Sequence, residues 1–131
     1  MKDNRTVKIE GRSLPRGVKQ LAVPTICNVR IPIIRATVEQ VPELAEGDRL
    51  LDAYFCMERL VIFVREGQSK THERDSITHE LAHAFIYLSG LGHRLKGFFD
   101  KPEAYDRFEE EIVRAMTPHL CGINLGGAPW L

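Results

Sequence analysis

The sequence predicts an α+β fold, with a short antiparallel β-sheet followed by two helices. Two observations support this prediction. β-branched and aromatic residues are concentrated in short runs between residues 33 and 64, whereas the apolar residues of the second half recur with helical spacing. With 131 residues, of which 44% are hydrophobic and 27% charged, the chain has the size and composition of one soluble globular domain.

Three runs predict the strands, namely residues 33–40, 50–56 and 59–64. The last run, Arg-Leu-Val-Ile-Phe-Val, is the strongest strand signal because nearly all of its residues are apolar and most are β-branched or aromatic. Pro24 and Pro32 interrupt the apolar segment around the first strand, and proline cannot donate a hydrogen bond to a neighbouring strand. They indicate short or edge strands in residues 21–41.

Two segments with helical periodicity predict the helices. The first helix extends from about residue 72 to 89; Ser69 or Thr71 can cap its start, and Gly90 and Gly92 end it. Residues 91–102 form a loop in this prediction. The second helix extends from residue 102 or 103 to 117, with Pro102 in its first turn.

The first 20 residues are polar, basic and interrupted by glycine and proline, so they predict a flexible basic arm before a single domain of residues 21–131. Residues 1–35 contain eight basic and two acidic residues, which leaves a charge of +6 in a chain whose net charge is zero. A basic arm can contact nucleic acid or an acidic partner. No aromatic residues are interleaved to stack on bases, so a nucleic-acid partner is not expected.

The three cysteines are widely spaced and include no C-x-x-C pair, so they indicate neither a disulfide framework nor a cysteine zinc cluster. This pattern fits a reducing compartment. The chain has no apolar run of membrane-spanning length and no apolar N-terminal segment typical of a signal peptide. We therefore expect a cytoplasmic protein that does not bind a membrane.

The first predicted helix contains His79-Glu80-Leu81-Ala82-His83, which is the pattern H-E-x-x-H. Positions i and i+4 of a helix lie on the same face, so both imidazoles can bind one metal ion. Zn²⁺ is the expected ion because imidazole and carboxylate ligands suit it. Glu80 is adjacent to a ligand, so it can act as the general base that takes a proton from the attacking water. The pattern predicts metal-assisted hydrolysis of a peptide bond.

The residues alone leave the third metal ligand open. A metzincin site requires histidine six residues after His83, where this chain has Ser89, so that class is excluded. His93 is one candidate, and the glutamates of the second helix are the others. Glu109 shares a helical face with the apolar residues of that helix, whereas Glu110 lies about 100° further round.

Residues 33–120 resemble a group of small zincin-like proteins, often found in phages and prophages, that are related to the ImmA/IrrE metallopeptidases. The resemblance rests on His79-Glu80-Leu81-Ala82-His83-Ala84 and on residues 110–116, which match a second motif, E-x-x-V-x-x-L, except for a final methionine. It implies that Glu110 is the third zinc ligand. It also implies that the strand before the active-site helix, residues 59–64, is a sheet edge along which an extended peptide pairs. A second resemblance, to SprT-like proteases, implies His93 as the ligand.

The expected function is therefore that of a zinc-dependent metallopeptidase of the zincin-like type, acting on a protein or peptide. His79 and His83, with Glu110 or Glu109, are the expected metal ligands. The alternative is a non-catalytic zinc-binding module with a partner-binding or regulatory role, in which the basic arm contacts the partner. Glu80 favours catalysis, because a purely structural zinc site needs no carboxylate at that position.

Overall fold

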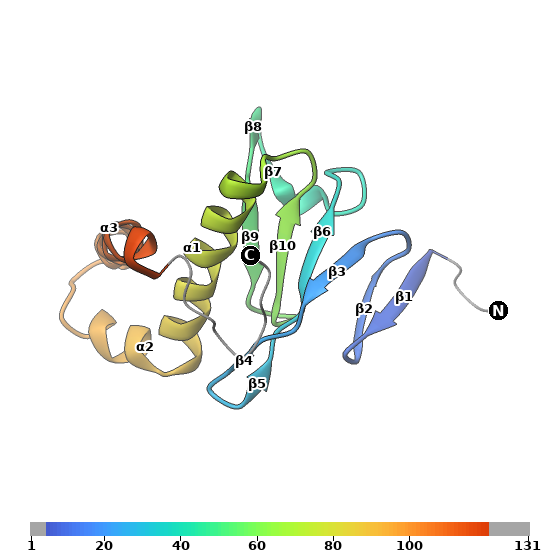
Figure 1. Ribbon diagram of the computed structural model, residues 1–131. Coiled ribbons are helices and arrows are strands. Elements are labelled where there is room, and N and C mark those ends of the chain that lie inside the picture. Colours follow the sequence, from blue (N-terminus) through green and yellow to red (C-terminus); the bar gives the residue numbers. More distant parts are fainter. Residues whose placement is uncertain (1–4, 121–131) are drawn as a thin grey trace.

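The computed structural model describes residues 5–120; residues 1–4 of the predicted arm and residues 121–131 of the predicted domain lie outside the described residues (Figure 1). The fold is α+β, as predicted. The strands are β1 (Thr6–Ile9), β2 (Arg12–Pro15), β3 (Lys19–Ala22), β4 (Thr25–Ile26), β5 (Val29–Arg30), β6 (Ile33–Ala36), β7 (Ala45–Glu46), β8 (Arg49–Leu50), β9 (Ala53–Cys56) and β10 (Val61–Arg65). The helices are the short 3-10 helix η1 (Pro42–Leu44), α1 (Lys70–Leu88), α2 (Leu91–Lys96) and α3 (Pro102–Leu120).

Four strands form the main sheet in the order β3–β6–β10–β9. β3 is antiparallel to β6 and β9 is antiparallel to β10, but β6 and β10 are parallel. The prediction of an antiparallel sheet is therefore wrong at this pair. β10 lies between β6 and β9. The chain runs through β9 in the direction opposite to β6 and reverses again at the β9–β10 hairpin, so β10 runs parallel to β6.

Apolar residues cover both faces of the sheet. α1 packs on one face, alongside β9 and β10 (Figure 1), where one layer contains Ile33, Phe55, Ile62, Val64, Ile77, Leu81 and Ala84. The alternate residues of the same strands face a second layer, which contains Leu14, Ile34, Val41, Leu44, Val61 and Phe63. The sheet is thus sandwiched between α1 and the segments that precede and follow β6.

β10 lies in the centre of the sheet, and its residues Val61–Val64 are completely buried. A strand that is covered on both faces has an almost continuous apolar sequence, which explains the strength of its signal. The expectation that this strand forms the sheet edge is wrong. The edge on the α1 side is β9, the strand that pairs with β10 alone.

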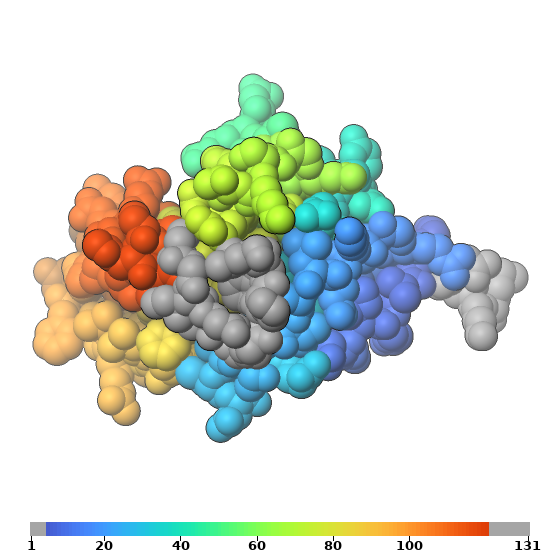
Figure 2. Space-filling view, viewed as in Figure 1, coloured from blue at the N-terminus to red at the C-terminus, as the bar shows by residue number. Residues whose placement is uncertain are grey.

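The N-terminal residues form a hairpin of β1 and β2 at the end of the molecule opposite α3 (Figure 2, blue and red). Leu14 is fully buried in the second apolar layer. The Arg12 guanidinium donates hydrogen bonds to the backbone carbonyls of Arg59 and Arg30 at 3.0 and 2.7 Å. The predicted flexible arm is therefore wrong for residues 5–20, and β3 crosses the predicted domain boundary at residue 21. One buried leucine and one bridging arginine order a segment whose composition is polar.

The first predicted helix is confirmed, with Ser69 as its N-cap: the Ser69 hydroxyl accepts a hydrogen bond from the His72 backbone N–H at 3.1 Å. Gly90 follows α1 with φ of +80°, a conformation that favours glycine. The loop prediction for residues 91–102 misses α2, and α3 extends to Leu120, three residues beyond the predicted end. The predicted strands are present but shorter, mainly because turns occupy residues 37–40 and 57–60. No helix within residues 5–120 is long and apolar enough to cross a membrane.

Candidate metal centre

α3 packs against α1, on the side of α1 away from the sheet (Figure 1). Ala82 and Ile86 of α1 and Val113 of α3 form this contact and are buried. The short side chain of Ala82 lets the two helices approach closely. This packing places Glu109 and Glu110, one turn before Val113, opposite the histidines of α1.

His79, His83 and Glu110 form the only group of histidine, cysteine and acidic residues in the described chain that is close enough to hold a metal ion. The Nε2 atom of His79 lies 2.7 Å from Glu110 Oε1, and the Nε2 atom of His83 lies 3.1 Å from Glu110 Oε2. The two Nε2 atoms are 3.2 Å apart. Two imidazole nitrogens and a carboxylate therefore converge on one point between α1 and α3.

Glu109 has a different position from Glu110. Its Oε2 atom accepts a hydrogen bond from Nδ1 of His83 at 2.6 Å, on the opposite edge of the imidazole ring from the convergence point. Its Oε1 atom accepts a hydrogen bond from the Tyr105 hydroxyl, also at 2.6 Å. Glu109 therefore fixes the orientation of His83 and leaves Nε2 directed at the centre, which is the usual role of a carboxylate behind a metal-binding histidine.

Tyr105 is held in place by its surroundings. Its side chain is buried, and its ring packs against Phe99 and Phe108 with centroid distances of 5.7 and 6.3 Å. The backbone of α2 passes directly over its hydroxyl, because a Cβ atom at Gly92 would lie 2.9 Å from that oxygen. α2 thus contributes a backbone wall behind the Tyr105–Glu109 pair.

The pKa values of the two histidines are shifted in opposite directions. Burial lowers the pKa of His79 below its ordinary value. Burial would lower the pKa of His83 as well, but the hydrogen bond to Glu109 and the charges of the neighbouring glutamates raise it above its ordinary value. The same hydrogen bond holds the pKa of Glu109 below its usual range. Glu109 is therefore a charged acceptor, and the Nδ1 atom of His83 carries a proton.

Glu80 lies beside this centre and lines the adjoining groove. Burial raises its pKa to about 7; the positive charge of His83 opposes this shift and the negative charge of Glu110 adds to it. A carboxylate with a pKa near neutrality can both accept and donate a proton under physiological conditions. Glu80 is thus suited to proton transfer at a reaction centre.

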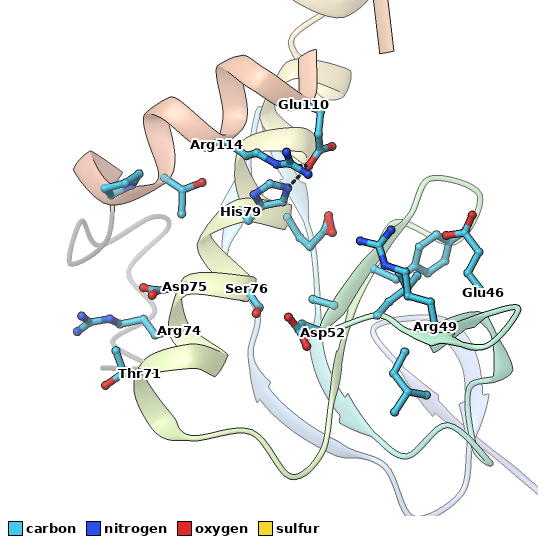
Figure 3. Close-up of a pocket in the computed structure, with 17 residues that line it drawn as sticks. Glu46, Arg49, Asp52, Thr71, Arg74, Asp75, Ser76, His79, Glu110 and Arg114 are labelled. Atoms are coloured by element: carbon cyan, nitrogen blue, oxygen red, sulfur yellow. Dashed lines mark hydrogen bonds and ion pairs between the residues drawn. The ribbon is translucent and has the colours of Figure 1, made fainter. Parts of the chain in front are cut away.

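A groove of about 920 Å³ opens beside the three converging residues. α1 and α3 form one wall, and the β7–β8 hairpin and the start of the edge strand β9 form the other (Figure 3). The lining includes His79, Glu80, Glu110, Arg114, Arg49 and Tyr54. The centre is therefore open to solvent along the groove beside the edge strand β9.

The donor atoms fit a zinc ion. Catalytic zinc sites use three protein ligands, typically imidazole nitrogens and a carboxylate oxygen, and leave a fourth position open. Zinc bonds of about 2.0–2.1 Å in a tetrahedral arrangement require ligand atoms about 3.3 Å apart. The observed separations of 2.7, 3.1 and 3.2 Å come close to this requirement. His79, His83 and Glu110 could hold the ion after a small outward movement.

The structure brings together most of the residues that the sequence selected. His79, His83, Glu80, Glu110 and Glu109 all lie at the centre, whereas His93 is exposed on α2 and is not part of the cluster. Sequence reasoning missed the contribution of α2 and the link from Tyr105 to Glu109. The spacing of four residues between these two on a predicted helix was the available signal.

Comparisons with known proteins gave no match: no family model matches the chain, and neither a curated protein nor a solved structure is detectably similar to it.

Proposed function

We propose that this protein is a zinc-dependent metallopeptidase, similar to the small zincin-like proteins related to ImmA/IrrE. The convergence of His79, His83 and Glu110 at the end of an open groove is the observation that carries the proposal. Its ligand set of two histidines and a glutamate is the one used by several zinc peptidases. Other divalent metals accept the same ligands, so metal identity is part of the test.

Glu80 is the general base in this proposal. A bound zinc ion supplies Lewis acidity, which polarises the substrate carbonyl and makes water easier to deprotonate. Glu80 accepts the proton of the attacking water and then donates it to the leaving amine nitrogen. Its burial beside the two histidines, which raises its pKa, supports both transfers.

The substrate is a peptide in an extended conformation. The edge strand β9 borders the groove, and backbone groups on the free side of an edge strand can pair with an added strand. In this proposal β9 pairs with the extended peptide, a role expected from the sequence for residues 59–64. Glu109 and Tyr105 contribute indirectly, since they hold the His83 ring in the orientation that metal binding requires.

Metal analysis tests the site itself. The purified wild-type protein should contain close to one equivalent of zinc, and the His79→Ala variant should contain little. Both proteins should give the same far-UV circular dichroism spectrum, which shows that the loss is local. Equal zinc in the two proteins would refute the metal site.

Comparison of Glu80→Gln with the wild type tests catalysis. The substitution keeps the size of the side chain and removes its basic carboxylate, so zinc content should persist while hydrolysis of a quenched-fluorescent peptide library falls at least about 100-fold. If wild-type protein with bound zinc cleaves no member of the library, the alternative of a non-catalytic zinc-binding module is favoured.

A further inference from the structure

We infer that the groove takes an acidic peptide segment, whose carboxylates pair with Arg114 on one wall and Arg49 on the other. This inference rests on the proposed peptidase function and deepens it by naming the substrate class. It follows from the positions of two arginines and from the pairing of the acidic residues around them (Figure 3).

Arg114 lies on α3, one turn after Glu110, and its side chain is 69% exposed. Its Nε atom is 3.8 Å from Glu110 Oε1, which is a long contact, whereas Glu110 makes closer contacts with His79 and His83. The guanidinium thus retains free N–H donors next to the reaction centre. A guanidinium presents these donors in a planar fork that matches a carboxylate.

Arg49 lies on the opposite wall, in the β7–β8 hairpin. Its side chain is exposed, lines the groove, and makes no hydrogen bond or ion pair within residues 5–120. Arg35, Arg59 and Arg65 behave differently, because each pairs with a carboxylate at 2.7–2.9 Å. In Figure 3 the Arg49 side chain is directed across the groove towards His79 and Glu110.

Most of the carboxylates that line the groove are already engaged. Asp52 is paired with His72 and Arg65 at 2.8 and 2.9 Å, and Asp75 also has a partner. Glu110 contacts His79 and His83, and Glu80 is the general base of the proposed reaction. Glu46 faces Arg49 across the hairpin, but no ion pair joins them. Arg74 also lines the groove. The groove therefore offers at least two available cations, Arg114 and Arg49, to a ligand and few available anions.

A peptide can supply the carboxylate from an Asp or Glu side chain or from its C-terminus. Both carboxylates would pair with a guanidinium in the same way. A charge-assisted pair with a partly exposed arginine is expected to favour the acidic ligand by roughly 3- to 10-fold. The preference should decrease with ionic strength, because salt screens exposed charges.

The test uses zinc-loaded protein and quenched-fluorescent octapeptides in which one position at a time holds Glu or Gln. Each peptide is made with a free and with an amidated C-terminus, so that side-chain and terminal carboxylates are distinguished. The variants are Arg114→Gln and Arg49→Gln. Arg94→Gln is the matched control, because Arg94 is exposed on α2 and lies outside the groove. Binding of the same peptides to zinc-loaded Glu80→Gln, measured by fluorescence anisotropy, gives a readout that needs no turnover.

The wild type should prefer Glu peptides over Gln peptides roughly 3- to 10-fold, both in kcat/KM and in affinity. This preference should be larger at 50 mM salt than at 500 mM salt. The preference should fall towards 1 in the Arg114→Gln and Arg49→Gln proteins and persist in Arg94→Gln. Equal use of Glu and Gln peptides by the wild type would overturn the inference and leave the peptidase function intact. A uniform loss of kcat in Arg114→Gln on both peptide series would also overturn it, because Arg114 would then act on the reacting atoms. Without any cleavage, the anisotropy measurement alone decides the acidic preference.

Discussion

Replacing Glu109 and Glu110 one at a time by glutamine tests whether Glu110 is a metal ligand and Glu109 the residue that orients a ligand. The two side chains are adjacent on α3 and both contact His83, but on opposite edges of its ring. Glu110→Gln removes an anionic donor from the centre itself. Glu109→Gln leaves all three donors in place and weakens the hydrogen bond that holds His83.

The two losses of zinc affinity should differ in size. Structural zinc sites bind with roughly 10–16 kcal/mol, so an equal share for each of three ligands is about 3–5 kcal/mol. Loss of that share by Glu110→Gln corresponds to roughly two to four powers of ten in affinity. In Glu109→Gln the amide oxygen can still accept from His83 while the amide nitrogen faces Tyr105. The expected loss is therefore that of an outer-shell substitution, about 10- to 100-fold.

The assay is a competition titration against a chromophoric zinc chelator, carried out for both variants at the same pH and ionic strength. Glu111→Gln is the matched control, because Glu111 is the next residue of α3, is exposed and lies outside the cluster. It should bind zinc as the wild type does. If Glu109→Gln loses as much affinity as Glu110→Gln, or more, the assignment of the two roles is refuted.

Three further predictions concern Gly92, the effect of zinc on stability, and Asp52. Gly92→Ala places a Cβ atom 2.9 Å from the Tyr105 hydroxyl. Zinc affinity should therefore fall by about tenfold, as for other outer-shell changes. Unchanged zinc affinity in the same competition titration would contradict the role of α2. Zinc at about 100 times its Kd should add about 2.7 kcal/mol to the free energy of unfolding, so chelation should lower the Tm of the wild type but not of His79→Ala. Burial would raise the pKa of Asp52, but its hydrogen bonds with His72 and Arg65 hold it below the usual range. The stability that Asp52 contributes is therefore complete above about pH 5 and is lost as the pH falls below about 4. Denaturant titrations of wild type and Asp52→Asn should show a difference that shrinks over this range, and a constant difference would contradict the prediction.

Local sequence signals predicted α1 and its two histidines, since a cap at Ser69 and a four-residue spacing are properties of one helix. The choice between Glu109 and Glu110 could not be made in the same way. Helical periodicity favours Glu109, which shares a face with the apolar residues, but Glu110 is the residue that lies with the two histidines. The rotation of α3 about its axis decides which glutamate meets them. That rotation is fixed by the packing of Val113 on α1, a contact between segments about 30 residues apart in sequence.

Tertiary contacts also explain the errors in the sheet and at the N-terminus. The run of buried residues in β10 indicated a strand, but its position between β6 and β9 depends on how the β9–β10 hairpin docks. Residues 5–20 have the composition of a tail, and they are ordered because Leu14 enters a core formed by distant strands. Neither of these contacts can be predicted from the local spacing of apolar residues.

α3 is attached to the rest of the protein by a small apolar contact, since Tyr105 and Val113 are the buried residues of that helix. α1, by comparison, buries six residues. The carboxylate contacts between α3 and the histidines therefore supplement this apolar contact, and a metal ion shared by both helices would cross-link them. Metal binding would then hold α3 against the domain. In hydrogen exchange, the amides of α3 should gain more protection from zinc than those of β10, which is already buried on both faces.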